Sequence, residues 1–148
     1  MNIKATRLLT SLASLIFISA CSRAPQQTAE TGTDKQLMDP AALAKTLNYP
    51  HAPLPVIFNV GPVAQIKGAI HIGPTARQDN LDQLRQQLAN LPKDKEVVIY
   101  CGCCPFSRCP NVRPAIELLQ ELKFTQAKLL NLPTSLNEDW VSKGYPME

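Results

Sequence analysis

An uninterrupted apolar segment, Val97-Val98-Ile99-Tyr100, constrains the fold of this chain more than any other part of its sequence. It follows the turn-like Lys93-Asp94-Lys95 and ends at Cys101. A strand without alternating polar residues is typical of parallel sheets, because helices cover both faces of such sheets. The segment therefore predicts a strand at 96–100 that is buried on both faces, and with it an α/β fold.

Strand and helix patterns alternate through the rest of the folded region. Asp39-Pro40 is a helix-start signature, because Asp caps a first turn and Pro fits its first position. Such patterns predict strands at 55–60, 69–72 and 127–131. They predict helices that begin at Asp39, run from Asn80 to the break at Pro92, and cover 115–122. A last helix is predicted from the capping box Ser135-x-x-Glu138 through Trp140. This order predicts a mostly parallel sheet flanked by helices, in one domain over residues 39–148.

The amino terminus has the pattern of an export signal. Lys4 and Arg7 precede an apolar run over 8–18, which ends in Ile18-Ser19-Ala20-Cys21. Small residues after such a run are typical of a cleavage site. The run is too short for a permanent membrane span, which needs about 20 residues. Residues 1–20 are therefore interpreted as a signal peptide.

The Ile-Ser-Ala-Cys ending also resembles the signal of bacterial lipoproteins. The resemblance implies cleavage before Cys21 and lipid attached to that residue. Ser22, not Asp, follows, and by the usual sorting pattern this implies an outer-membrane protein that faces the periplasm. An ordinary secretory signal is the alternative. The polar stretch after Cys21 has no apolar period, so residues 21–38 are predicted to be a disordered tether.

Charge and cysteine positions exclude two classes of protein. Loss of Lys4 and Arg7 with the signal lowers the formal net charge from +3 to about +1, which argues against nucleic-acid binding. The four cysteines other than Cys21 all lie within 101–109, so they cannot staple distant parts of a small secreted fold. The hydrophobic core must therefore be stabilised by side-chain packing and not by disulfides.

The cysteine-rich loop is the candidate site. Cys101 is the first residue after the strand at 96–100, where ligands bind in parallel sheets, and the loop leads into a helix N-terminus. Backbone N–H groups and the helix dipole at such a place favour an anion and lower the pKa of a thiol. Arg108 and Arg113 add positive charge. The arrangement suits a nucleophilic thiolate that attacks sulfur or phosphorus. Gly102 is interpreted as a backbone requirement of the loop.

This strand-Cys-loop-helix unit resembles a rhodanese domain. Gly68-Ala69-Ile70-His71-Ile72 is similar to a strand of that family, and segments 91–95 and 140–148 add to the likeness. The resemblance implies a five-stranded parallel sheet and a cysteine, here Cys101, that carries sulfane sulfur as a persulfide. It implies a small sulfur donor and a thiol acceptor, with no cofactor and no metal. It identifies no protein partner. The loop residues that would contact the substrate are Gly102, Cys103, Cys104, Arg108 and Arg113.

The chain departs from the family pattern at three places. Asn59-Val60-Gly61 stands where the family usually has Asp-Val-Arg, and Thr134-Ser135 stands where it usually has Gly-Gly. Six residues separate Cys101 from Arg108, whereas the family has Cys-x-x-x-x-Arg and the related phosphatases have one residue more. The loop fits neither spacing, so the substrate is left open.

Three other interpretations of the cysteines are open. Cys101 can form a reversible disulfide with Cys104 or Cys109, and either thiol could also resolve a persulfide. Four thiolates could instead hold zinc or copper(I), although the vicinal Cys103-Cys104 pair makes a tetrahedral site awkward. The domain could also lack turnover. The two arginines could be solvated or pair with Glu117.

Overall fold

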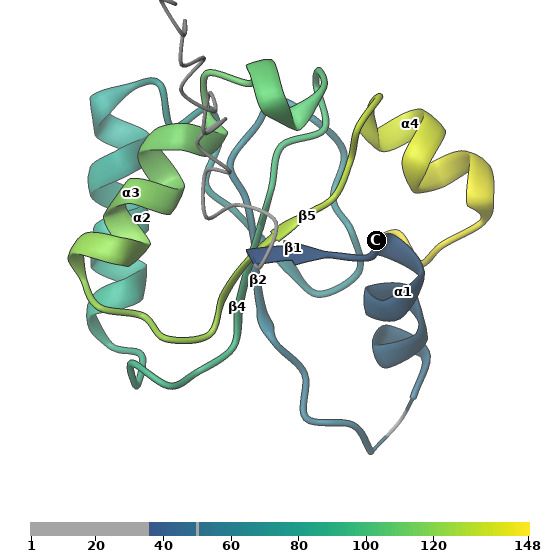
Figure 1. Ribbon diagram of the computed structural model, residues 1–148, viewed down its shortest axis with the longest axis horizontal. Coiled ribbons are helices and arrows are strands. Elements are labelled where there is room, and N and C mark those ends of the chain that lie inside the picture. The colour runs from purple at the N-terminus through teal and green to yellow at the C-terminus, as the bar shows by residue number, and fades with distance from the viewer. Residues whose placement is uncertain (1–35, 50) are drawn as a thin grey trace, which may run out of the picture.

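The computed structural model describes residues 36–49 and 51–148, in which a parallel sheet is covered by helices on both faces (Figure 1). The strands are β1 (Leu37–Met38), β2 (Val56–Asn59), β3 (Ala69–His71), β4 (Val97–Tyr100) and β5 (Ala127–Leu130). They lie in the order β1-β5-β4-β2-β3, and each neighbouring pair is parallel. The predicted α/β fold with five strands is confirmed, and these strands are all parallel.

The predicted signal peptide at 1–20, the lipid site at Cys21 and the tether as far as residue 35 lie outside the described residues. The tether was predicted to reach residue 38, which is two residues too far. Leu37 and Met38 form β1 and pair with Leu129 and Leu130 of β5. Two residues carry no hydrophobic period, so the sequence pattern could not reveal this edge strand.

No helix within residues 36–49 and 51–148 has the length and apolar character needed to cross a membrane.

The four predicted helices are present. They are α1 (Pro40–Asn48), α2 (Gln78–Ala89), α3 (Val112–Glu121) and α4 (Leu136–Asp139). α1 and α4 begin where the sequence predicts them, whereas α2 and α3 begin two and three residues earlier than the predicted starts at Asn80 and residue 115. The Asp39 carboxylate accepts a hydrogen bond from the Ala42 N–H at 3.1 Å, as the cap signature predicts. Ser135 Oγ likewise accepts from the Glu138 N–H at 3.2 Å. However, the Ser135 N–H donates to Asp139 and not to Glu138, so only half of the predicted capping box forms.

β4 connects two hydrophobic cores, one on each face of the sheet. Val97 and Ile99 pack in the core under α2 and α3, which lie together on one side in Figure 1. Val98 and Tyr100 pack in the core under α1 and α4 on the other side, together with Trp140. None of these five side chains has accessible surface. The central apolar run of the sequence is therefore the central strand of the sheet.

Tyr100 is the last residue of β4, and its hydroxyl forms hydrogen bonds to the backbone of the segment between β2 and β3. Its hydroxyl accepts a hydrogen bond from the Ile66 N–H at 3.0 Å and donates to the Ala64 carbonyl at 3.2 Å. Burial of the phenol raises the pKa of Tyr100 to about 12, because the charged phenolate would lose its water. The side chain therefore stays neutral in the folded protein over the ordinary pH range.

The free energy of unfolding is expected to fall by about 2 kcal/mol through Tyr100 as the pH rises from 10.0 to about 12. The unfolded chain releases the Tyr100 proton near pH 10.0, whereas the folded chain holds it to about pH 12. The contribution is thus present in full below pH 10.0 and is lost as the pH passes the folded pKa. Urea unfolding of the parent and of Tyr100→Phe across this window measures the effect.

The Tyr100→Phe variant should be less stable at neutral pH, by about 1–3 kcal/mol, because the Ile66 N–H loses its partner. It should also lose less stability than the parent at alkaline pH. An equal loss of unfolding free energy in the two proteins at alkaline pH would contradict the assignment of this loss to Tyr100.

Candidate active site

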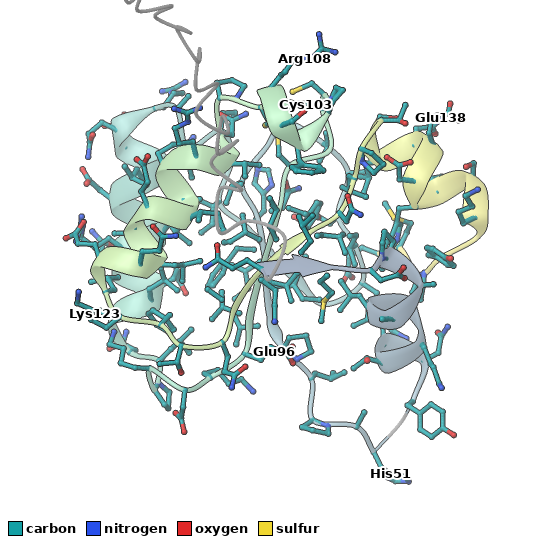
Figure 2. The ribbon with its side chains drawn as sticks, viewed as in Figure 1. His51, Glu96, Cys103, Arg108, Lys123 and Glu138 are labelled. Carbon is teal, nitrogen blue, oxygen red and sulfur yellow. The ribbon has the colours of Figure 1, made fainter. Side chains whose placement is uncertain are left out.

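Four free thiols lie in the loop between β4 and α3, at the carboxyl edge of the sheet (Figure 2). Cys101 follows β4 directly, and Cys109 follows a short 3-10 helix, η2 (Phe106–Arg108), inside the loop. In parallel sheets this edge is where ligands bind, because the loops there are free to vary. The structure therefore puts the cysteines where the sequence predicts the site.

Hydrogen bonds with two neighbouring segments hold the cysteine loop in place. The Leu136 N–H donates to the Gly102 carbonyl at 2.8 Å, and the Phe106 N–H donates to the Leu132 carbonyl at 3.3 Å. The Ala76 N–H donates to the side-chain oxygen of Asn111 at 3.1 Å. The loop is thus positioned by the segments that follow β5 and β3.

Gly102 meets a backbone requirement of this loop, as predicted. Its φ is +71°, a conformation that favours glycine. A Cβ there would also lie 2.6 Å from the Cβ of Leu136. The residue shapes the loop beside Cys101 through its backbone.

Cys101 is enclosed, with 2% of its surface exposed. A Cβ added to Gly61 would lie 2.3 Å from the Cys101 Sγ, so only glycine leaves room for the sulfur in its present place. The Asn111 side-chain N–H group donates to the same sulfur at 3.5 Å. Gly61 and Asn111 are therefore site residues that the sequence analysis did not select.

Asn59 sets the turn that brings Gly61 to the sulfur. It ends β2, is fully buried, and accepts a hydrogen bond from the Gly61 N–H at 3.0 Å. Its side-chain N–H group donates to the Val63 carbonyl at 2.8 Å. The difference from Asp-Val-Arg noted in the sequence thus marks a real feature of the site, a tight turn packed against Cys101.

The thiols ionise differently from the sequence-based expectation. Burial raises the pKa of Cys101, although the Cys103 N–H and the Asn111 side chain oppose the shift. Burial acts in the same direction on Cys109, but the thiol of Cys101 and the N–H groups of Asn111 and Val112 together lower its pKa. The N-terminus of α3 therefore stabilises the thiolate of Cys109, whereas the sequence analysis assigned that effect to Cys101.

Three sulfur atoms form a cluster. The Sγ atoms of Cys101 and Cys103 are 3.2 Å apart, and those of Cys101, Cys103 and Cys109 all lie within 4.8 Å of one another. The Cys104 Sγ is 3.5 Å from that of Cys103 but is not one of these three. Of the two thiols predicted to resolve a persulfide, Cys109 is the one that belongs to the cluster with Cys101.

Arg108 and Arg113 do not surround Cys101. Both side chains are exposed, and Figure 2 shows Arg108 pointing away from the sheet. They line a groove of about 700 Å³ whose other walls include Cys109, Ile116 and Leu129, and Cys101 is not among its lining residues. Arg108 is the last residue of η2, which ends directly before Cys109. Neither arginine forms an ion pair with a described residue, including Glu117.

Comparison with known proteins agrees with this architecture. The model of the rhodanese-like domain family matches residues 62–135, which is half of the chain and includes the whole cysteine loop. None of the curated proteins matches the chain. The matched segment, the parallel sheet and the cysteine directly after the central strand all indicate the same family. The chain belongs to the rhodanese-like domain family.

Proposed function

We propose that the protein is a sulfurtransferase that carries sulfane sulfur as a persulfide on Cys101. The observation that carries the proposal is the position of the Cys101 Sγ, directly after β4 and within reach of the Asn111 side-chain N–H group at 3.5 Å. That donor and the Cys103 N–H favour the thiolate against the effect of burial. A thiolate held by fixed donors is the nucleophile that sulfur transfer requires.

In the first step the Cys101 thiolate attacks the outer sulfur of a small anionic donor such as thiosulfate. A sulfur–sulfur bond forms to the Cys101 Sγ, the bond within thiosulfate breaks, and sulfite leaves with the electron pair. The products are a Cys101 persulfide anion and sulfite, so atoms and charge balance without an added oxidant. The same N–H donors that favour the thiolate would favour the persulfide anion.

In the second step an acceptor thiolate attacks the outer sulfur of the persulfide and regenerates the Cys101 thiolate. Cys109 offers another route, because its sulfur belongs to the cluster around Cys101 and its pKa is lowered. Attack by the Cys109 thiolate on the Cys101 Sγ of the protonated persulfide would form a disulfide and release hydrosulfide, and an acceptor thiol would then reduce that disulfide. Cys109 is therefore the resolving thiol that this geometry favours over Cys104.

The cellular setting is part of the proposal. We propose that lipid on Cys21 anchors the domain to the periplasmic face of a bacterial outer membrane. The support is the sequence pattern at 1–21 alone. The mass of the protein purified from bacterial membranes tests this: a chain that begins at a lipid-modified Cys21 is expected, and an unmodified amino terminus after a different cleavage site would refute it.

The sulfurtransferase proposal is tested by intact mass after reduction and incubation with thiosulfate. The chain is expected to gain one sulfur atom, and digestion without reductant should locate that atom on the peptide that holds Cys101. Cyanide should then remove it as thiocyanate. A chain that gains no sulfur, or that only loses two hydrogens to a disulfide, would make the domain a thiol-disulfide module instead.

Asn111→Asp should slow sulfur loading at pH 7 by at least about tenfold. The new carboxylate keeps an acceptor for the Ala76 N–H but replaces the donor to the Cys101 Sγ by a like charge. At 3.5 Å, two like charges repel by about 4–5 kcal/mol at an effective dielectric constant near 20, which opposes the thiolate. Initial loading rates measure the effect. Asn111→Ser, which removes the donor without adding charge, should lose less, and an unchanged rate in Asn111→Asp would contradict the role.

The double variant Arg108→Gln/Arg113→Gln should affect the acceptor more than the donor. Both side chains line the groove that reaches Cys109, the proposed resolving thiol, so an acceptor with a carboxylate that reduces the Cys101–Cys109 disulfide can pair with them there. Exposed ion pairs contribute about 0.2–1 kcal/mol each, so loss of both should raise the KM for mercaptoacetate about 2- to 30-fold. The KM for 2-mercaptoethanol, which lacks the carboxylate, and the rate of sulfur loading are the controls. Equal losses with both thiols would contradict this use of the groove.

A further inference from the structure

The sulfur cluster has a second chemical capacity that does not depend on a persulfide. The Sγ atoms of Cys101, Cys103 and Cys109 lie within 4.8 Å of one another, and all three thiols are free. Cys101 and Cys109 are buried, whereas Cys103 is exposed and closes the cluster on the solvent side. Two of the three converging thiols are buried and one is exposed to solvent. An ion could therefore enter past Cys103 without opening the hydrophobic core.

The spacing of the three sulfur atoms fits one metal ion at their centre. Metal–thiolate bonds of about 2.3 Å put three sulfur atoms around a trigonal ion about 4.0 Å apart. The observed range, from 3.2 Å between Cys101 and Cys103 to at most 4.8 Å, brackets that separation.

Three sulfur ligands favour copper(I) over zinc. Thiolates are soft ligands that select copper(I) among the common ions, and zinc structural sites are almost always tetrahedral with four ligands. The fourth thiol, Cys104, does not belong to the converging group, and its sulfur neighbours that of Cys103 at 3.5 Å. A site made of three sulfur atoms does not need both members of the vicinal Cys103-Cys104 pair.

Donors around the cluster offset the charge that such a site would carry. Binding of copper(I) to three thiols releases three protons and leaves a complex of net charge −2, with no change in oxidation state. Asn111 donates from its side chain to the Cys101 Sγ at 3.5 Å. The N–H groups of Asn111 and Val112, at the N-terminus of α3, face the Cys109 sulfur.

We propose that Cys101, Cys103 and Cys109 form a trigonal copper(I) site. Because the Cys101 Sγ is a ligand in this site and the nucleophile in the proposed sulfur transfer, bound copper(I) and a Cys101 persulfide exclude each other. The site stands whether or not the chain transfers sulfur.

The test is anaerobic titration of the reduced full chain, in detergent, with copper(I) buffered by the chelator bathocuproine disulfonate. One copper(I) per chain is expected. Its X-ray absorption edge should be typical of three-coordinate copper(I), and the extended fine structure should show sulfur as the only ligand atom. Cys103→Ser should weaken binding by at least about 100-fold, more than the 10- to 100-fold loss typical of residues outside the ligand set. Because Cys103 is exposed, this variant should keep the parent's circular dichroism.

Cys104→Ser is the matched control and should change copper(I) affinity by less than about tenfold. Equal affinity of the parent and Cys103→Ser would overturn the proposal. The proposal would also be overturned if Cys104→Ser lost as much copper(I) affinity as Cys103→Ser and the parent bound zinc through all four thiolates. Sulfur loading is measured separately on the same samples: if it fails in copper-free parent, the sulfurtransferase proposal fails while the copper titration keeps its meaning.

Discussion

Cys101→Ser is expected to abolish the gain of sulfur from thiosulfate. Serine has nearly the shape of cysteine, so the hydrogen bond from Asn111 and the packing against Gly61 can persist, and the fold should be kept. The hydroxyl cannot ionise near neutral pH and cannot form a persulfide. Intact mass after incubation with thiosulfate measures the loss, and the expected signal is that of the untreated protein.

The matched control for this prediction is Cys104→Ser, which changes a thiol of the same loop outside the three-sulfur cluster. It should gain one sulfur atom at a rate close to that of the parent. Cys109→Ser should also load sulfur but should release hydrosulfide more slowly in the absence of an added acceptor. A sulfur atom found on Cys103 or Cys109 in the Cys101→Ser chain would show that the nucleophile is a different thiol of the cluster.

The sequence predicts the centre of this fold better than its edge. The run 97–100 has no polar residue, which favours a strand buried on both faces. It forms β4, in the middle of the sheet. β1 has two residues, which lie at the sheet edge beside β5. Its place depends on backbone pairing with a segment some ninety residues away, and such pairing leaves no local pattern.

The position of Cys101 could be predicted from the sequence, but its surroundings could not. A cysteine after a central strand and before a helix has only one place in a parallel sheet. Gly61 approaches that cysteine from the segment after β2 and Asn111 from the far end of the same loop, and no hydrophobic or spacing pattern in the sequence marks either contact. The arginines illustrate the opposite case. Their charge is visible in the sequence, yet η2 directs Arg108 into solvent rather than toward the sulfur.

Gly61→Ala is expected to slow sulfur loading by about 100-fold while the protein stays folded. The added Cβ would lie 2.3 Å from the Cys101 Sγ and 3.1 Å from its Cα, so the sulfur must move out of its present place. Gly61 is not among the glycines with positive φ, so alanine strains no backbone there. The cost to stability is that of overpacking, about 1–3 kcal/mol. The cost to the reaction is larger, because a displacement of about 1 Å at a reacting atom can lower a rate by 100-fold.

Gly144→Ala separates the two costs. Gly144 has a φ of +71° and open space around its Cβ position, so alanine there strains the backbone without touching the site. This control should lose stability, measured by urea unfolding, and should load sulfur at the parent's rate. Gly61→Ala should lose loading rate far beyond its loss of stability. If the two variants load sulfur equally fast, the close approach of Gly61 to Cys101 does not position the nucleophile.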